Sequence, residues 1–156
     1  MLKIPPEEYY KSLPKKRCGA GILFFNGKNE LLIVKPNYKE GWSIPGGVVD
    51  ENESPKAAAI REAKEEIGLD VSDLKLAYIV YTAPEGIKTE AFQFLFFGGI
   101  LNDTQISKIK LQEDELDEFR FVSENEVVDL LASGLKERVP ECLSAIKNNT
   151  VAYKES

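Results

Sequence analysis

Residues 47–69 read GVVDENESPKAAAIREAKEEIGL, and this stretch decides how the rest of the chain is organised. It predicts a glycine-led loop followed by a helix over about 55–67, because Ser54 is a good N-cap and Pro55 suits the first helical position. Gly68 then suits the residue just after the helix. One stripe of the helix is small or apolar and would let it lie close to a sheet: Ala59, Ile60, Ala63 and Ile67.

The other side of the predicted helix carries three acidic residues. Glu62, Glu65 and Glu66 stand at positions i, i+3 and i+4, so their side chains share one face. Carboxylates about 5–6 Å apart repel by about 3 kcal/mol per pair at an effective dielectric constant of about 20. If the face is partly buried it needs a cation, and such oxygen ligands suit Mg²⁺ or Mn²⁺. Taken alone, the three glutamates also fit a plain solvated helix.

The wider spacing is more specific than the three glutamates. Gly47, Glu53 and the segment 61–69, REAKEEIGL, stand at the fixed positions of the Nudix box, and the chain resembles the Nudix hydrolase family there. Ala63 stands where the family usually has a larger aliphatic residue. The preceding residues 42–47, WSIPGG, are also similar to the family's lead-in.

The resemblance extends in general layout over roughly residues 17–132. It implies an α/β protein with the Nudix fold, an α/β/α sandwich with a mixed β-sheet between helices. A chain of 156 residues is expected to form one domain over 1–156. Within it, we expect residues 1–16 to form an irregular N-terminal lead and residues 136–148 to form a C-terminal helix.

The resemblance also implies a reaction, namely attack of water on a phosphoanhydride bond with the help of Mg²⁺, with Mn²⁺ as the alternative ion. By this resemblance Glu62, Glu65 and Glu66 would hold the metal, and Glu62, Glu65 or a downstream acid would act as the base. Glu53 would pair with Arg61 and orient the helix. The downstream candidates are Glu115 and Glu118, in an acidic run whose members the sequence does not distinguish.

The substrate implied by the resemblance is a nucleoside diphosphate linked to another group. A nucleoside triphosphate is slightly preferred for a compact chain, and ADP-ribose, a nucleotide sugar or a dinucleoside polyphosphate stays open. The alternatives are a non-catalytic nucleotide-sensing module of the same fold and a plain interaction domain. A sensing module would be expected to lack some of the acidic residues of the box, and none is missing here. A homodimer is common in the family.

Four further residues are candidates for binding the substrate. Gly46 and Gly47 let the backbone approach a phosphate without a Cβ in the way. Tyr38 lies in a loop that also carries lysines and could touch phosphate or base, or could simply be exposed. Tyr81 could stack on a base, although an aromatic residue in a strand is more often part of the core.

Composition narrows the class of protein. The chain is 43% hydrophobic and 29% charged, which is ordinary for a globular domain. A net charge of −6 argues against binding a nucleic-acid polymer, but not against a nucleotide, because a divalent metal reverses the local charge. Two cysteines are too few for a disulfide framework, and the apolar runs are too short or broken to span a membrane. We therefore expect a cytoplasmic protein.

The remaining pattern predicts elements around this centre. Strands are expected at 17–25, 30–35, 42–44, 71–82, 90–100 and 119–122, with a turn at 26–29 and a bulge at Gly98 and Gly99. The strand at 90–100 is apolar on both faces, so helices are expected on both sides of the sheet. Ser123 and Glu126 form a capping box that starts a helix running through Leu131.

Overall fold

The computed structural model describes residues 4–156, and its centre is one mixed β-sheet. The strands described are β1 (Arg17–Phe25), β2 (Leu31–Pro36), β3 (Gly46–Val48), β4 (Lys75–Thr82), β5 (Ala91–Ile100), β6 (Leu116–Val122) and β7 (Ala152–Glu155). They are ordered β6-β2-β1-β5-β4-β7, with β3 also paired to β1. The pairs β1–β5 and β4–β7 are parallel and the other pairs are antiparallel.

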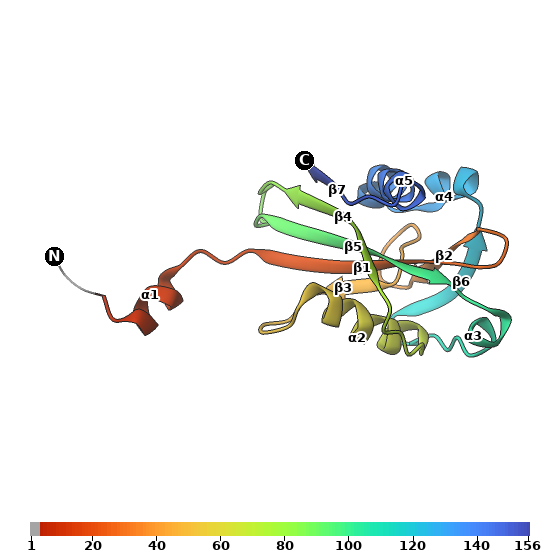
Figure 1. Cartoon of the computed structure of the whole chain (residues 1–156), viewed down its shortest axis with the longest axis horizontal. Coiled ribbons are helices and arrows are strands. Elements are labelled where there is room, and N and C mark those ends of the chain that lie inside the picture. Colours follow the sequence, from red (N-terminus) through yellow and green to blue (C-terminus); the bar gives the residue numbers. More distant parts are fainter. Residues whose placement is uncertain (1–3) are drawn as a thin grey trace.

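Helices cover both faces of this sheet. The helices of residues 4–156 are α1 (Pro6–Ser12), α2 (Pro55–Ile67), α3 (Asp103–Ser107), α4 (Glu124–Leu130) and α5 (Ser133–Lys147), and of these α1 lies apart from the sheet (Figure 1). Figure 1 shows α2 and α3 on one side of the sheet and α4 and α5 on the other. The predicted α/β/α layering is therefore confirmed.

A separate hydrophobic core lies on each face, because the central strand β5 is apolar on both sides. Leu95 packs toward α5, in a core that includes Val139. Phe96, the next residue, points to the opposite face and packs in a core with Ala59 and Ile67 of α2. This alternation follows from the two-residue period of a strand.

The local sequence sets both ends of α2, as predicted. The Ser54 hydroxyl oxygen accepts a hydrogen bond of 3.1 Å from the Ala57 N–H, and Gly68 adopts the left-handed conformation with φ of 71°. The buried stripe consists of Ala58, Ala59, Ala63 and Ile67 together with Glu66, whereas Ile60 is only half-buried. Small residues on this stripe let the helix lie close to the sheet.

The strand predicted at 42–44 forms only isolated bridges, and the neighbouring segment β3 joins the sheet instead. Gly46 has φ of 155° and lies against β1, where a Cβ would stand 2.3 Å from the carbonyl oxygen of Ala20. The two glycines therefore begin a strand that lies close to β1, rather than the loop that the sequence predicted. The predicted bulge is present, because Leu23 pairs with Phe97 and Phe25 pairs with Ile100.

Several boundaries differ from the sequence prediction. The C-terminal helix α5 begins at Ser133 rather than 136 and continues through Pro140. No element was predicted between residues 100 and 119, but this segment contains α3, which begins with a capping box between Asn102 and Gln105. Strand β6 begins at Leu116 rather than 119, and the edge strand β7 was not predicted.

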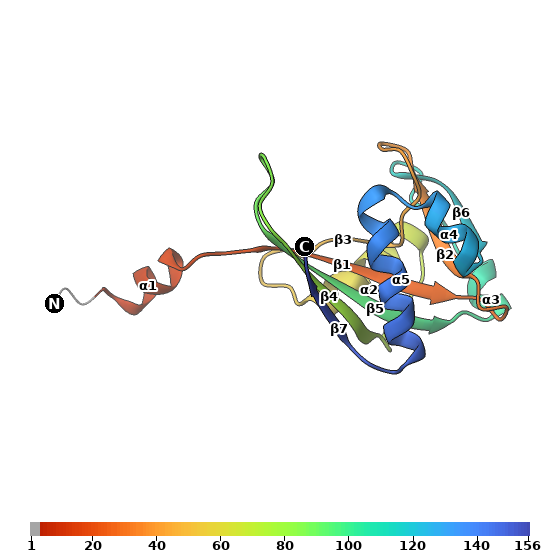
Figure 2. The same cartoon turned by 90° about the horizontal axis from the view of Figure 1, so that it is seen from above.

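The N-terminal segment was expected to be irregular, and this was wrong for residues 6–12. They form α1, a helix with a proline in its first turn and with no buried residue. Figures 1 and 2 show α1 lying apart from the sheet, joined to β1 by an extended segment. Residues 1–3 lie outside the described part of the chain.

Candidate active site

The three glutamates of α2 have different surroundings. Glu66 is 6% exposed, and its Oε2 accepts a hydrogen bond of 3.1 Å from the main-chain N–H of Gly46. Glu62 lies against Gly47, where an added Cβ would stand 2.3 Å from its Oε1. Glu65 is the most exposed, with half of its side-chain surface open to solvent. The glycines of β3 thus give the two inner carboxylates room beside the strand.

Arg61 joins the loop before α2 to the acidic face. Its Nε and Nη2 donate to the two carboxylate oxygens of Glu53 at 2.8 and 3.0 Å, which is the pair expected from the sequence. Nη2 also donates to the carbonyl oxygen of Val48 at 3.0 Å. Nη1 donates to Glu62 at 2.9 Å and to Glu65 at 3.2 Å. One guanidinium therefore contacts the loop, the strand and two of the three glutamates.

The charges on this face are only partly balanced. Burial, followed by the carboxylates of Glu62 and Glu115, raises the pKa of Glu66 to about 8, although the Gly46 N–H opposes the shift. Burial also raises the pKa of Glu62, and Arg61 opposes that shift. The Arg61 hydrogen bonds lower the pKa of Glu53 to about 2. Two inner carboxylates are therefore short of positive charge, as expected of ligands for a cation.

The donor set fits a hard divalent cation, because it consists of carboxylate oxygens without histidine or cysteine. Within residues 4–156, however, no three such side chains are arranged around a common point. Arg61 draws Glu62 and Glu65 toward itself, while Glu66 bonds to Gly46.

The structure distinguishes the two downstream acids. Glu115 lies in the turn before β6, and its charge raises the pKa values of both Glu62 and Glu66. Glu118 lies within β6, opposite Lys35, and accepts a hydrogen bond of 2.6 Å from Arg120. Only Glu115 is therefore placed beside the acidic face.

A cleft of about 390 Å³ runs beside these residues. Glu66, Gly46 and Gly47 line it, together with Tyr38 and the neighbouring Lys39. Burial, and then the charges of Glu66, Glu115 and Glu62, raises the pKa of Tyr38. Three of the four predicted substrate contacts are thus brought together at the acidic end of the cleft.

The fourth predicted contact, Tyr81, does not line this cleft. Its hydroxyl donates to Glu90 at 2.8 Å, and its ring packs against Phe92 at 5.5 Å between centroids. The cleft instead contains residues that the sequence did not single out: Arg17, Gln93 and Arg138. Arg17 and Gln93 lie in strands and Arg138 in α5, so no local pattern could have grouped them.

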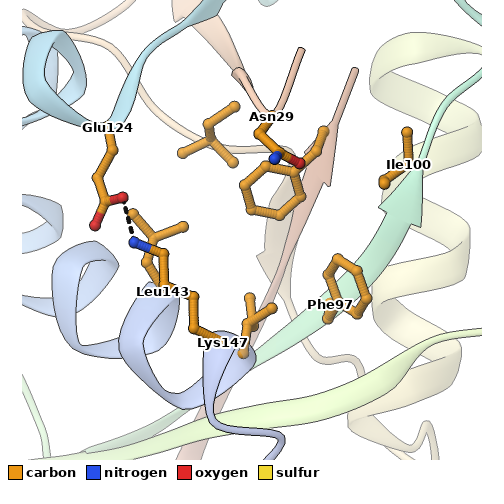
Figure 3. Close-up of a pocket in the computed structure, with 9 residues that line it drawn as sticks. Asn29, Phe97, Ile100, Glu124, Leu143 and Lys147 are labelled. Carbon is orange, nitrogen blue, oxygen red and sulfur yellow. Dashed lines mark hydrogen bonds and ion pairs between the residues drawn. The ribbon is translucent and has the colours of Figure 1, made fainter. Parts of the chain in front are cut away.

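A second cavity, of about 350 Å³, lies between the ends of β1 and β5 and helix α5 (Figure 3). Its walls are mainly apolar: Phe25, Leu31, Phe97, Ile100, Leu143 and Ile146. Glu124 and Lys147 pair with each other at its edge, at 2.5 Å. Because its charged groups are already paired and none of the α2 acids lines it, the cleft beside α2 is the candidate active site.

Comparison with known proteins agrees with this geometry. The NUDIX domain family model matches residues 15–142. An RNA pyrophosphohydrolase of Hydrogenovibrio crunogenus is 33% identical over 116 residues, which are 66% of this chain and 69% of that protein. A putative 8-oxo-dGTP diphosphatase of Bacillus subtilis is 39% identical over 82 residues, which are 53% of this chain and 52% of that protein.

The fold has solved counterparts as well. The crystal structure of a MutT protein from Methanosarcina mazei Go1 matches with a TM-score of 0.68 and 25% identity, over 88% of this chain and 99% of that chain. The chain therefore belongs to the Nudix hydrolase family. It is a hydrolase of the pyrophosphohydrolase type, as the resemblance to the Nudix box had implied. In residues 4–156, no helix combines the length and apolar character needed to cross a membrane.

Proposed function

We propose that this chain cleaves a phosphoanhydride bond of a nucleoside diphosphate linked to another group, with a nucleoside triphosphate slightly preferred. ADP-ribose, a nucleotide sugar and a dinucleoside polyphosphate are the other candidates. The observation that carries the proposal is the Glu66 carboxylate, which is buried at the cleft with Glu62 and Glu115 nearby; burial, and then the charges of these two residues, raises its pKa to about 8. A nearby cation would favour the ionised form of this group, and a diphosphate in the same cleft needs a cation to neutralise its charge.

The proposed metal ligands are Glu62, Glu65 and Glu66, with Glu115 beside them, and Mg²⁺ is the expected ion. A bound divalent ion would neutralise phosphate charge and lower the pKa of a water molecule. The carboxylate of Glu62 or Glu65 would take the proton from that water.

Other residues would position these groups and the phosphate chain. Arg61 would act as a positioning residue, because it links the loop at Glu53 to the acidic face. Gly46 and Gly47 line the cleft, so a phosphate bound there would lie beside their main chain. Lys39 lines the same end of the cleft and adds a positive charge there.

The two curated relatives support different substrates of one chemical type. The B. subtilis protein is named for a nucleoside triphosphate and the H. crunogenus protein for RNA. An RNA substrate is therefore the second candidate for this chain. The free nucleotide is preferred, because a net charge of −6 opposes binding of a polyanion.

A substrate panel tests the proposal. Nucleoside triphosphates, ADP-ribose, a nucleotide sugar, a dinucleoside polyphosphate and an RNA with a 5′-triphosphate would each be incubated with the protein and Mg²⁺. Release of phosphate, pyrophosphate or nucleotide would be measured, with chelator as the control. We expect turnover of at least one compound that stops with chelator. A folded protein that binds nucleotide but hydrolyses none of them would instead be the non-catalytic sensing module.

A further inference from the structure

An amide group without a partner forms part of the cleft wall. Gln93 belongs to β5, and its side chain lies across Gly19 of the adjacent strand β1. A Cβ on Gly19 would stand 2.2 Å from Oε1 of Gln93 and 2.9 Å from Nε2, so the carboxamide occupies the space that the glycine leaves. Within residues 4–156, no hydrogen bond engages this carboxamide, and its polar atoms are not sealed from the cleft.

Neighbouring polar groups of the cleft are already engaged. Arg17 donates to the Thr89 hydroxyl at 2.7 Å, and Arg138 donates to Thr82 at 3.2 Å. Gln93 differs from them because it presents both a donor and an acceptor to the cleft. That pair of groups is available to a ligand.

The surroundings of Gln93 suit a flat ligand with a polar edge. Leu95, two residues further along the same face of β5, and Ile44 both line the cleft and are at most 5% exposed. Leu135 lines it from α5. A nucleobase has apolar faces and an edge of hydrogen-bonding groups, so it matches apolar walls with one carboxamide between them.

The distance from the acidic face also suits a nucleotide. Gly19 pairs with Gln93 on one side and with Val48 of β3 on the other, so β3 and β5 flank β1. Adjacent strands are 4.7–4.9 Å apart, which separates β3 from β5 by roughly 10 Å. Strand β3 carries Gly46, the partner of Glu66. In a nucleotide, the ribose separates the base from the phosphates. A base bound at Gln93 would therefore place the phosphate chain beside β3.

We propose that Gln93, held over Gly19, hydrogen-bonds the edge of the substrate's nucleobase and so determines which nucleotides are hydrolysed. This inference rests on the proposed function. The amide N–H would donate to a base acceptor, and the amide oxygen would accept from a base N–H. Adenine offers such an adjacent donor and acceptor, and Gln forms this bidentate contact with it in other settings.

The test compares kcat/KM for ATP, GTP, CTP and UTP in the wild type and in Gln93→Leu. Inorganic triphosphate, which has no base, serves as a further substrate. The wild type should discriminate among the four nucleotides by about tenfold or more, and Gln93→Leu should reduce that ratio severalfold. Hydrolysis of inorganic triphosphate should not change. Gln105→Leu is the matched control, because Gln105 caps α3 and does not line the cleft.

Two further variants test whether misfolding, rather than the lost carboxamide, explains a loss of discrimination. Gly19→Ala should displace the Gln93 carboxamide, which is the flexible end of a side chain, and weaken discrimination as Gln93→Leu does. Gln93→Glu replaces the donor by an acceptor, so it should shift preference toward GTP, whose guanine presents adjacent N–H donors. Thermal unfolding would confirm that both variants are folded.

The outcomes separate this inference from the proposed function. If the wild type hydrolyses neither these four nucleotides nor any compound of the substrate panel, the proposed function fails and this inference falls with it. If the wild type hydrolyses nucleotides and the ratios survive in Gln93→Leu and Gln93→Glu, the role of Gln93 alone is overturned. A loss of rate on inorganic triphosphate as well would show a general disturbance of the cleft and would also count against base recognition.

Discussion

The main-chain N–H of Gly46 donates a hydrogen bond of 3.1 Å to Oε2 of Glu66, and this contact ties strand β3 to the acidic face of α2. The bond supports a carboxylate that is otherwise buried and close to two other acids. It links the segment that leads into the Nudix box to the helix of the box, so that both contribute to one site.

Glu66→Gln should separate folding from catalysis. The amide oxygen can keep the bond from Gly46, while the charge that burial disfavours is removed, so thermal stability should be unchanged or higher. Turnover with Mg²⁺ should fall by at least about 100-fold, the scale of one lost electrostatic group. Steady-state kinetics and thermal unfolding measure the two effects. Glu51→Gln, an exposed acid in the preceding loop, is the control. Normal turnover of Glu66→Gln at saturating Mg²⁺ would contradict the assignment.

The two glycines of β3 should respond differently to alanine. In Gly46→Ala the Cβ would meet the carbonyl oxygen of Ala20 at 2.3 Å, at a φ of 155°, and neither strand can move easily. We expect a loss of roughly 1–3 kcal/mol in the free energy of unfolding. In Gly47→Ala the Cβ would meet the end of the Glu62 side chain, which can rotate away. Denaturant unfolding should therefore show a near-native stability for Gly47→Ala, while kinetics show reduced turnover. Equal stabilities for the two variants would refute this distinction.

The downstream acids provide a matched pair. Glu115 lies near Glu62 and Glu66, whereas Glu118 pairs with Arg120 in β6. Glu115→Gln should weaken Mg²⁺ binding about tenfold or more, and Glu118→Gln should leave it unchanged. Isothermal titration calorimetry with Mg²⁺ measures both. A larger effect from Glu118→Gln would reverse the assignment.

Arg61→Lys should show that the planar guanidinium matters as well as the charge. Lysine cannot reproduce the two parallel bonds to Glu53 while also contacting Val48 and Glu62. We expect kcat/KM to fall by about 10–100-fold, as for other residues that orient metal ligands. Arg120→Lys, on an exposed surface pair, serves as the control. An unaltered kcat/KM in Arg61→Lys would show that positive charge alone suffices.

The two cysteines should differ in reactivity. Burial raises the pKa of the Cys142 thiol to about 12, and its side chain is fully enclosed in the core. Cys18 is only partly buried. Because the thiolate is the reactive form, a thiol reagent at pH 8 should modify one cysteine in the native protein and two after denaturation. Mass spectrometry would locate the first label, and early modification of Cys142 would contradict the packing of α5.

Much of the fold follows from local sequence. The caps at Ser54 and Gly68 and the alanine stripe fix α2 within its own segment, so the sequence predicted its bounds. The long strand β1 and the bulge in β5 also follow from local signals, namely an apolar run and paired glycines. By contrast, the short edge strand β7 owes its conformation to pairing with β4, about 70 residues earlier in the chain.

In the candidate site, too, some features follow from the local sequence and others from the tertiary structure. The sequence by itself determined that Glu62, Glu65 and Glu66 share one face, because helix periodicity is a local property. The pairing of Glu53 with Arg61 was implied by the resemblance to the Nudix family. Only the tertiary structure decided that Glu66 is buried against Gly46, that Glu115 rather than Glu118 lies nearby, and that Gln93 lies across Gly19. These relationships join segments far apart in the chain, and sheet pairing and burial, which no local pattern encodes, bring them together.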